Sequence, residues 1–221
     1  MDIRQLQGWL MERGQAVVID GRGGPATRAA IMGAFVNLEA PVVSDTDIAS
    51  FAQILGCTSQ QIRAIAQVES AGGGFTDEGR PKILFERHYF HRLTAGRFGI
   101  QSFSNPAAGG YKESSWEKLC LAACQDPDAA FASASWGKFQ VMGAHWQKLD
   151  YRSPIAMAFT MTRSEADHYE ALVRYIVRFG LVDAVRKLSA DPETNRDFAK
   201  GYNGPGYRKF DYHTKLARAM R

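Results

Sequence analysis

Several segments of the chain carry apolar residues at helical spacing, and the clearest lies between residues 58 and 69. Thr58 and Gln61 form a capping-box pattern, which predicts that a helix starts there. Four residues then follow at positions i, i+3, i+4 and i+7: Ile62, Ile65, Ala66 and Glu69. Three glycines at positions 72–74 predict the end of the helix.

This pattern places Glu69 at the end of an apolar stripe. Partial burial disfavours the charged form of a carboxyl and raises its pKa, which is the property that a general acid needs near neutral pH. The alternative is a glutamate at a frayed, exposed helix end beside the glycines. Spacing alone does not decide between the two interpretations.

The rest of the chain is predicted to be mainly helical. Residues 1–38 form a small helical unit, residues 39–44 a linker with Pro41, and residues 45–221 the main domain. Further helices are expected at 45–55, 116–123, 127–132, 164–179, 182–188, 194–198 and 211–220. Ser44 or Asp45 is expected to cap the first of these, and Ser164 to open the helix at 164–179. A short apolar run at 83–85 predicts an extended segment, whereas residues 94–111 and 201–207 have the composition of loops.

Composition narrows the class of protein. The chain has 221 residues, of which 45% are hydrophobic, so it can bury a sizeable core. A net charge of +4 suits an anionic partner such as a cell-wall polymer, a membrane surface or a nucleic acid. No run of five like charges and no aromatic-basic signature accompanies it, which argues against nucleic acid.

Cysteine and histidine positions favour neither disulfides nor a metal. Cys57, Cys120 and Cys124 are an odd number without a framework pattern, as expected in a reducing compartment. No further paired ligands and no His-Glu-x-x-His motif are present, so we expect no metal and no cofactor. The polar N-terminus predicts no signal peptide, and no apolar run is long enough to span a bilayer.

Residues 20–27 read Asp-Gly-Arg-Gly-Gly-Pro-Ala-Thr. This segment resembles the Asp-Gly-x-x-Gly-Pro-x-Thr signature of a helical peptidoglycan-binding module that occurs on wall hydrolases. The resemblance covers about half of that module. A purely structural helix pair, packed on the main domain, is the alternative for residues 1–38.

Four further motifs carry a second resemblance. They are Gln67–Ser70 with the glycines, Gly79–His88, Ser133–Gly143 and Tyr202–Tyr207. Together, over residues of about 45 to 220, they resemble the N-acetylmuramidase domain of bacteriophage endolysins, within the lysozyme superfamily and near goose-type lysozymes and soluble lytic transglycosylases. The resemblance implies an all-α, two-lobed domain with minor extended segments and a groove between the lobes.

The same resemblance assigns roles to residues. Glu69 matches the catalytic glutamate of the superfamily, and Tyr202 and Asn203 match a Tyr-Asn pair that lies near this acid in the relatives. Substrate contacts are expected from Gln140, Tyr202, Asn203, Tyr111 and Trp136, although a tryptophan such as Trp136 is more often part of the core. Glu86 and Asp77 are candidates for a second catalytic carboxylate; either could instead anchor a loop, and Glu86 could simply pair with Arg80 or Arg87.

The implied function is cleavage of the β-1,4 bond between N-acetylmuramic acid and N-acetylglucosamine, with bacterial peptidoglycan as the partner. The enzyme is expected to be a monomer that stays in the host cytoplasm until lysis and then acts on the wall. Alternatives are a lytic transglycosylase that leaves anhydromuramic ends, and a non-catalytic peptidoglycan-binding protein. Five basic residues near the C-terminus also suggest contact with anionic outer-membrane lipid: Arg208, Lys209, Lys215, Arg218 and Arg221.

Overall fold

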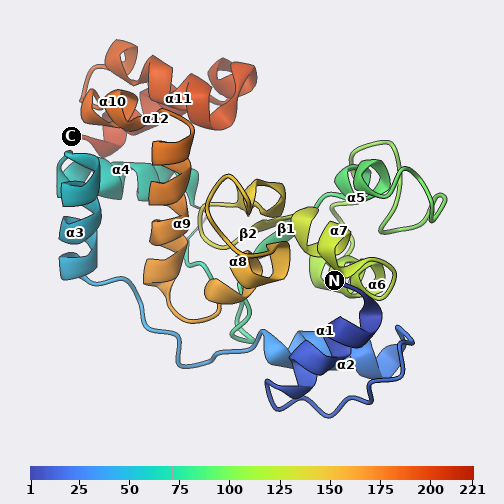
Figure 1. Cartoon of the computed structure of the whole chain (residues 1–221). Coiled ribbons are helices and arrows are strands. Elements are labelled where there is room, and N and C mark those ends of the chain that lie inside the picture. Colours follow the sequence, from blue (N-terminus) through green and yellow to red (C-terminus); the bar gives the residue numbers. More distant parts are fainter. Residues whose placement is uncertain (71) are drawn as a thin grey trace. The chain divides into compact units, whose positions relative to one another are not determined.

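A computed structural model of the chain describes residues 1–70 and 72–221. The chain divides into two compact units, each made of two stretches of sequence. Unit 1 comprises Met1–Ala40 and Phe75–Arg163, and unit 2 comprises Pro41–Gly74 and Ser164–Arg221. Both are mainly helical, as predicted, and the first crossing between them falls within the predicted linker (Figure 1). No helix in the described part has the length and apolarity that a membrane crossing requires.

Unit 1 combines short helices with a small sheet. Its helices are α1 (Ile3–Met11), α2 (Pro25–Ala34), α5 (Arg87–Leu93), α6 (Ser115–Ala123), α7 (Pro127–Ala132) and α8 (Pro154–Thr160), with the 3-10 helix η1 (Gly143–His145). The antiparallel sheet has the order β1 (Ile83–Phe85), β2 (Ala134–Trp136) and β3 (Val141–Met142). The extended run at 83–85 is therefore confirmed, whereas the sequence did not predict the β2–β3 hairpin.

Phe35 joins the N-terminal helices to the rest of unit 1. Its side chain is fully buried and lies at the end of α2. Five aromatic rings lie within 6.0 Å of its centroid: Trp9, Trp116, Phe131, Trp136 and Phe159. Residues 1–40 thus share one aromatic core with residues 75–163, because burying several large rings together contributes strongly to stability.

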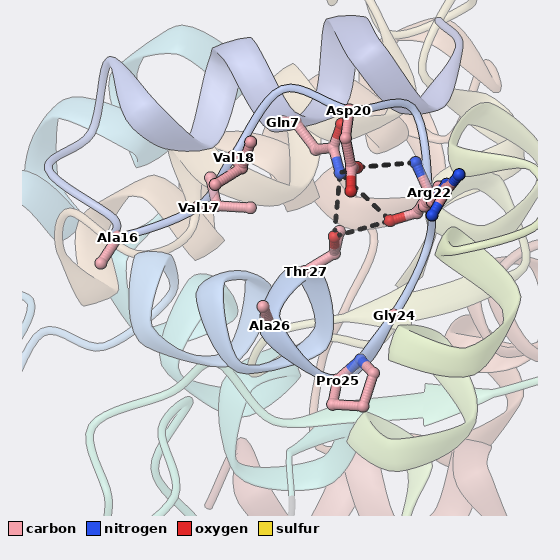
Figure 2. Close-up of a pocket in the computed structure, with 10 residues that line it drawn as sticks. All are labelled: Gln7, Ala16, Val17, Val18, Asp20, Arg22, Gly24, Pro25, Ala26 and Thr27. Carbon is pink, nitrogen blue, oxygen red and sulfur yellow. Dashed lines mark hydrogen bonds between the residues drawn. The ribbon is translucent and has the colours of Figure 1, made fainter.

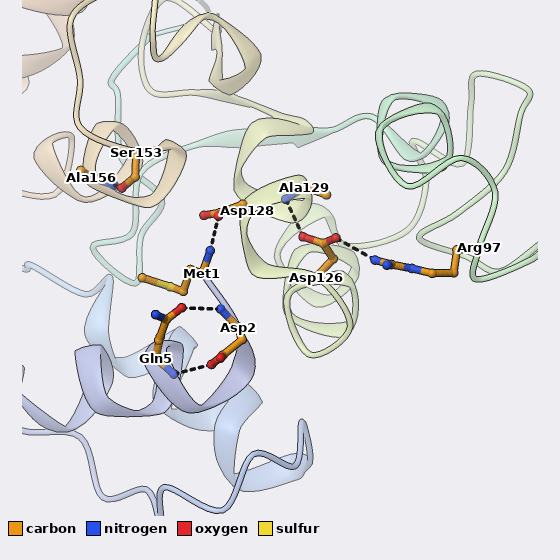
Figure 3. A network of polar contacts seen from close by, with 9 residues as sticks. All are labelled: Met1, Asp2, Gln5, Arg97, Asp126, Asp128, Ala129, Ser153 and Ala156. Atoms are coloured by element: carbon orange, nitrogen blue, oxygen red, sulfur yellow. Dashed lines mark hydrogen bonds and ion pairs between the residues drawn. The ribbon is translucent and has the colours of Figure 1, made fainter.

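The contact between Met1 and α7 supports the same attachment, and Asp126 stabilises the start of that helix. The Met1 amino group pairs with Asp128, and Asp2 caps α1. Asp126 accepts a hydrogen bond from the Ala129 backbone N–H and pairs with an Arg97 nitrogen at 2.9 Å (Figure 3). Aspartate at this position satisfies a backbone donor that the helix itself leaves free.

Unit 2 is a bundle of helices with two 3-10 segments. Its elements are α3 (Asp45–Leu55), α4 (Ser59–Glu69), α9 (Glu165–Arg178), α10 (Val182–Arg186), η2 (Pro192–Asn195), α11 (Arg196–Asn203), η3 (Pro205–Phe210) and α12 (Tyr212–Ala219). α4 packs against α3 and α12, and α9 packs against α3. Predicted caps at Ser44, Thr58 and Ser164 are present, each side chain accepting from a backbone N–H.

One predicted loop in unit 2 is wrong. Gly201, Tyr202 and Asn203 form the last turn of α11 rather than a loop. The glycine permits close packing, since a Cβ at Gly201 would lie 2.4 Å from the Leu181 side chain. The helix ends at Asn203, and the next residue, Gly204, has a φ of 74°, in the left-handed region that glycine adopts without strain.

We expect Phe35→Ala to lower the free energy of unfolding by about 3–5 kcal/mol, because it leaves a cavity among five rings. Val36→Ala, at a neighbouring side chain that is 40% exposed, is the matched control and should change it by less than about 0.5 kcal/mol. Urea unfolding followed by tryptophan fluorescence measures both. Equal effects of the two substitutions would contradict a shared core.

Candidate active site

The site is built from the C-terminal ends of two helices in unit 2. Glu69 is the last residue of α4, and Asn203 is the last residue of α11. The Asn203 side-chain Nδ2 donates a hydrogen bond of 2.9 Å to Glu69 Oε1. Ile62, Ile65 and Ala66 are buried, so the predicted apolar stripe is confirmed and the carboxyl at its end is held in place.

Burial dominates the electrostatics of Glu69. It raises the pKa of the Glu69 carboxyl from its ordinary 4.5 to about 7. The Asn203 hydrogen bond and the positive charge of Lys215 act in the opposite direction, because both favour the ionised form. The side chain is therefore protonated over much of the range in which a neutral-pH acid catalyst operates.

Tyr202 and Tyr212 lie near this carboxyl. Tyr202 stacks on Phe198 with ring centroids 5.5 Å apart, and it meets Tyr175 edge to face at 5.3 Å. Burial, followed by the nearby Glu69 charge, raises the pKa of Tyr202 well above its usual value and also raises that of Tyr212. Tyr202 and Tyr212 thus lie close enough to Glu69 to be affected by its charge.

In unit 1, Glu86 and Tyr111 lie together. Tyr111 donates its hydroxyl to Glu86 Oε2 at 2.9 Å, and His88 Nδ1 lies 3.2 Å from the same oxygen. Glu86 follows β1 directly and precedes α5, which explains its position at the end of a strand. The predicted pairing with Arg80 or Arg87 is wrong: Arg80 pairs with Glu78, and Arg87 donates to the Ala107 and Ala108 carbonyls. Asp77 is exposed in the turn before β1.

The β2–β3 hairpin carries two other predicted site residues. Gln140 is exposed at a φ of 51°, and its amide bonds to Ser135 Oγ at 2.9 Å and to the Gly137 carbonyl at 2.8 Å. Trp136 is fully buried, and its Nε1 donates to the Phe131 carbonyl at 3.0 Å. The prediction that Trp136 contacts substrate is therefore wrong, because its ring belongs to the aromatic core around Phe35.

The protein-family model Muramidase, described as N-acetylmuramidase, matches residues 58–221 of the chain. The chain belongs to the N-acetylmuramidase family. A solved structure, the crystal structure of the Burkholderia AP3 phage endolysin, is similar to it with a TM-score of 0.74 and 30% sequence identity, over 99% of this chain and 92% of that one. No curated protein matches it.

Because it belongs to this family, the muramidase is a peptidoglycan-degrading enzyme. The residues that the family model matches include Glu69, Glu86, Gln140 and Asn203. The resemblance expects Tyr202 and Asn203 near the acid, and the structure places Asn203 on Glu69 and Tyr202 within reach of its charge. The sequence assigns Lys215 only to a basic C-terminal segment. No local signal marks the effect of Lys215 on Glu69, since it arises from the packing of α12 on α4.

The raised pKa of Glu69 also predicts how stability depends on pH. A carboxyl whose pKa is higher in the folded state stabilises the fold below its unfolded value of 4.5 and loses that contribution as pH rises through about 7. The total amounts to on the order of 3 kcal/mol. Glu69→Gln has no titrating group at this position. The free energy of unfolding of the variant minus that of wild type should therefore increase between pH 4 and pH 8.

Urea unfolding at several pH values measures this difference. Glu193→Gln is the control of opposite sign, because hydrogen bonding to Arg196 lowers the pKa of Glu193 and removing the carboxylate lowers stability above pH 4.5. A stability difference between Glu69→Gln and wild type that does not change with pH would contradict a buried, protonated Glu69.

Proposed function

We propose that this muramidase is a phage endolysin that cleaves the β-1,4 bond between N-acetylmuramic acid and N-acetylglucosamine, with Glu69 as the general acid. The observation that carries the proposal is the half-buried Glu69 carboxyl, whose pKa lies at about 7. Such a group holds a proton at neutral pH and can release it to a leaving oxygen. The likeness to the Burkholderia phage endolysin supports the biological setting.

The hydrogen bond from Asn203 supports a defined position for the proton. Because Nδ2 is a donor, Glu69 Oε1 acts as the acceptor, and the proton resides on Oε2. Oε2 protonates the glycosidic oxygen as the bond to the anomeric carbon breaks and positive charge develops on the muramic ring. In hydrolysis, water then adds to that carbon and gives a proton back to Glu69.

The identity of the second catalytic carboxylate stays open among the candidates that the sequence named. Glu86 accepts a hydrogen bond from Tyr111 and lies 3.2 Å from His88 Nδ1, an arrangement that suits either a catalytic carboxylate or an anchor for the loop carrying Tyr111. Gln140, Tyr202 and Asn203 remain proposed sugar contacts. If the 6-hydroxyl of the muramic ring replaces water, the product carries an anhydro end, and the enzyme is a lytic transglycosylase.

Glu69→Gln keeps the shape of the side chain and removes its acid, so peptidoglycan digestion should fall about 10²–10⁴-fold. Wild-type activity should decline as pH rises through about 7, where Glu69 loses its proton. The fall in turbidity of a purified peptidoglycan suspension measures the digestion rate. Mass spectrometry of the soluble fragments shows whether their muramic ends are reducible or anhydro. Glu12→Gln, at an exposed side chain in unit 1, is the control.

Each result decides between named alternatives. Reducible muramic ends, lost in Glu69→Gln, support the hydrolase. Anhydromuramic ends support the transglycosylase. Undiminished digestion by Glu69→Gln overturns the role of Glu69, and absence of digestion by wild type leaves the non-catalytic binding protein.

We also infer that residues 1–38 bind peptidoglycan. A hollow of about 550 Å³ lies beside the motif at residues 20–27, with Val17, Val18 and Pro25 among the residues that line it. Gln7 is buried and donates to Asp20, Arg22 and Thr27 (Figure 2). The polar residues of the motif therefore hold its loop in shape, and mainly apolar surface is left for a ligand.

Val18→Asp, in the Glu69→Gln background, should weaken sedimentation with insoluble peptidoglycan about 10-fold, because a charge replaces apolar surface in the hollow. Val18 is 74% exposed, so the substitution leaves the core intact. Val42→Asp, at a valine that is 80% exposed outside the hollow, is the matched control. Equal binding by both variants would favour the purely structural role of residues 1–38.

A further inference from the structure

A second hollow lies in unit 2, beside the end of α4 that carries Glu69. It has a volume of about 390 Å³ and is lined by Gln67, Val68, Lys215, Arg218 and Ala219. The first two residues belong to the last turn of α4, and the other three belong to α12, which packs against α4. We call this hollow the basic pocket.

The two cations of the basic pocket are available to a ligand. Lys215 lies over the Tyr212 ring at 5.3 Å, and within the described part of the chain neither Lys215 nor Arg218 has a carboxylate at ion-pair distance. Other arginines of unit 2 are paired with acids three or four residues away: Arg174, Arg186 and Arg196. The pocket thus concentrates positive charge that the fold itself does not neutralise.

Like charges three residues apart on a helix repel each other, and a bound anion would relieve that repulsion. An ammonium and a guanidinium are the strongest donors to a carboxylate, and the exposed Gln67 amide adds a neutral donor. Lys215 is also near enough to Glu69 to lower the pKa of that carboxyl. An anion held here would therefore lie close to the reacting bond.

The substrate supplies such an anion. The sugars of peptidoglycan are uncharged where the lactyl group is amide-linked to the peptide stem, and the free carboxylates lie on the stem itself. We propose that Gln67, Lys215 and Arg218 bind a carboxylate of the peptide stem and so make stem-bearing glycan the preferred substrate. This inference rests on the proposed function, because it assumes that Glu69 cleaves the glycan.

The test compares two substrates that differ only in charge. Purified peptidoglycan is digested either untreated or after its carboxylates have been converted to amides with carbodiimide and ammonia. The assay is run at pH 5.5, where Glu69 keeps its proton in every variant, so that changes in its pKa do not contribute. Wild type should lose about 10-fold in kcat/KM on the amidated substrate, mainly through KM, because charged hydrogen bonds are lost.

The double variant Lys215→Gln/Arg218→Gln should digest both substrates at the rate that wild type shows on the amidated one. This equality also shows that the variant is folded. Lys187→Gln/Lys200→Gln is the matched control, since it removes the same charge from exposed positions of unit 2 outside the pocket. It should discriminate between the substrates as wild type does.

Three outcomes overturn the inference. Wild type could digest both substrates equally through Glu69, the double variant could retain the discrimination, or the control could lose it. If instead the double variant loses only binding to vesicles of anionic phospholipid, the pocket serves the lipid contact suggested by the basic C-terminus. Failure of the proposed function is seen separately, as digestion that survives Glu69→Gln.

Discussion

The burial of one carboxyl at the end of α4 is the constraint on which the rest of unit 2 depends. Removing Glu69 from water costs free energy whenever the group is charged, and the fold offsets this cost only in part through Asn203 and Lys215. The packing of α4 against α3 and α12 must supply the remainder. A helix end that lacked this support would expose the carboxyl, and its pKa would return to an ordinary value.

Unit 1 depends on a different feature, its aromatic core around Phe35. Phe35 lies among rings from the N-terminal helices, from α6 and α7, and from the hairpin, so these segments form one core. The family match begins only at residue 58. Residues 1–40 are nevertheless an integral part of unit 1. If they bind the cell wall, as inferred above, they do so from a surface that belongs to the folded unit and not from a separate, tethered module.

Local chemistry explains which parts of the fold the sequence could predict. The caps at Ser44, Thr58 and Ser164 and the apolar stripe before Glu69 are encoded within a few residues, and all are present. Gly201 and Gly204 are typical of loops, so the sequence predicts a loop where the structure has the last turn of α11. The close packing of Gly201 against Leu181 within that helix is a tertiary contact. The burial of Trp136 is likewise set by rings distant in sequence. The site followed the same division: motifs located Glu69, Tyr202 and Asn203, but no sequence pattern located Lys215 beside the acid.

The neighbours of Glu69 also bear on why its pKa stops near 7. A site designed only to keep a proton would surround the carboxyl with apolar groups, yet Asn203 and Lys215 both favour the ionised form. In the proposed reaction Glu69 gives up its proton in the first step and must accept one from water in the second, so both states occur in each cycle. Burial alone would stabilise the acid and make proton release costly, while the two polar neighbours alone would leave the group ionised before substrate arrives. Their opposition holds the carboxyl between these limits, which is the condition under which one group can serve as acid and then as base.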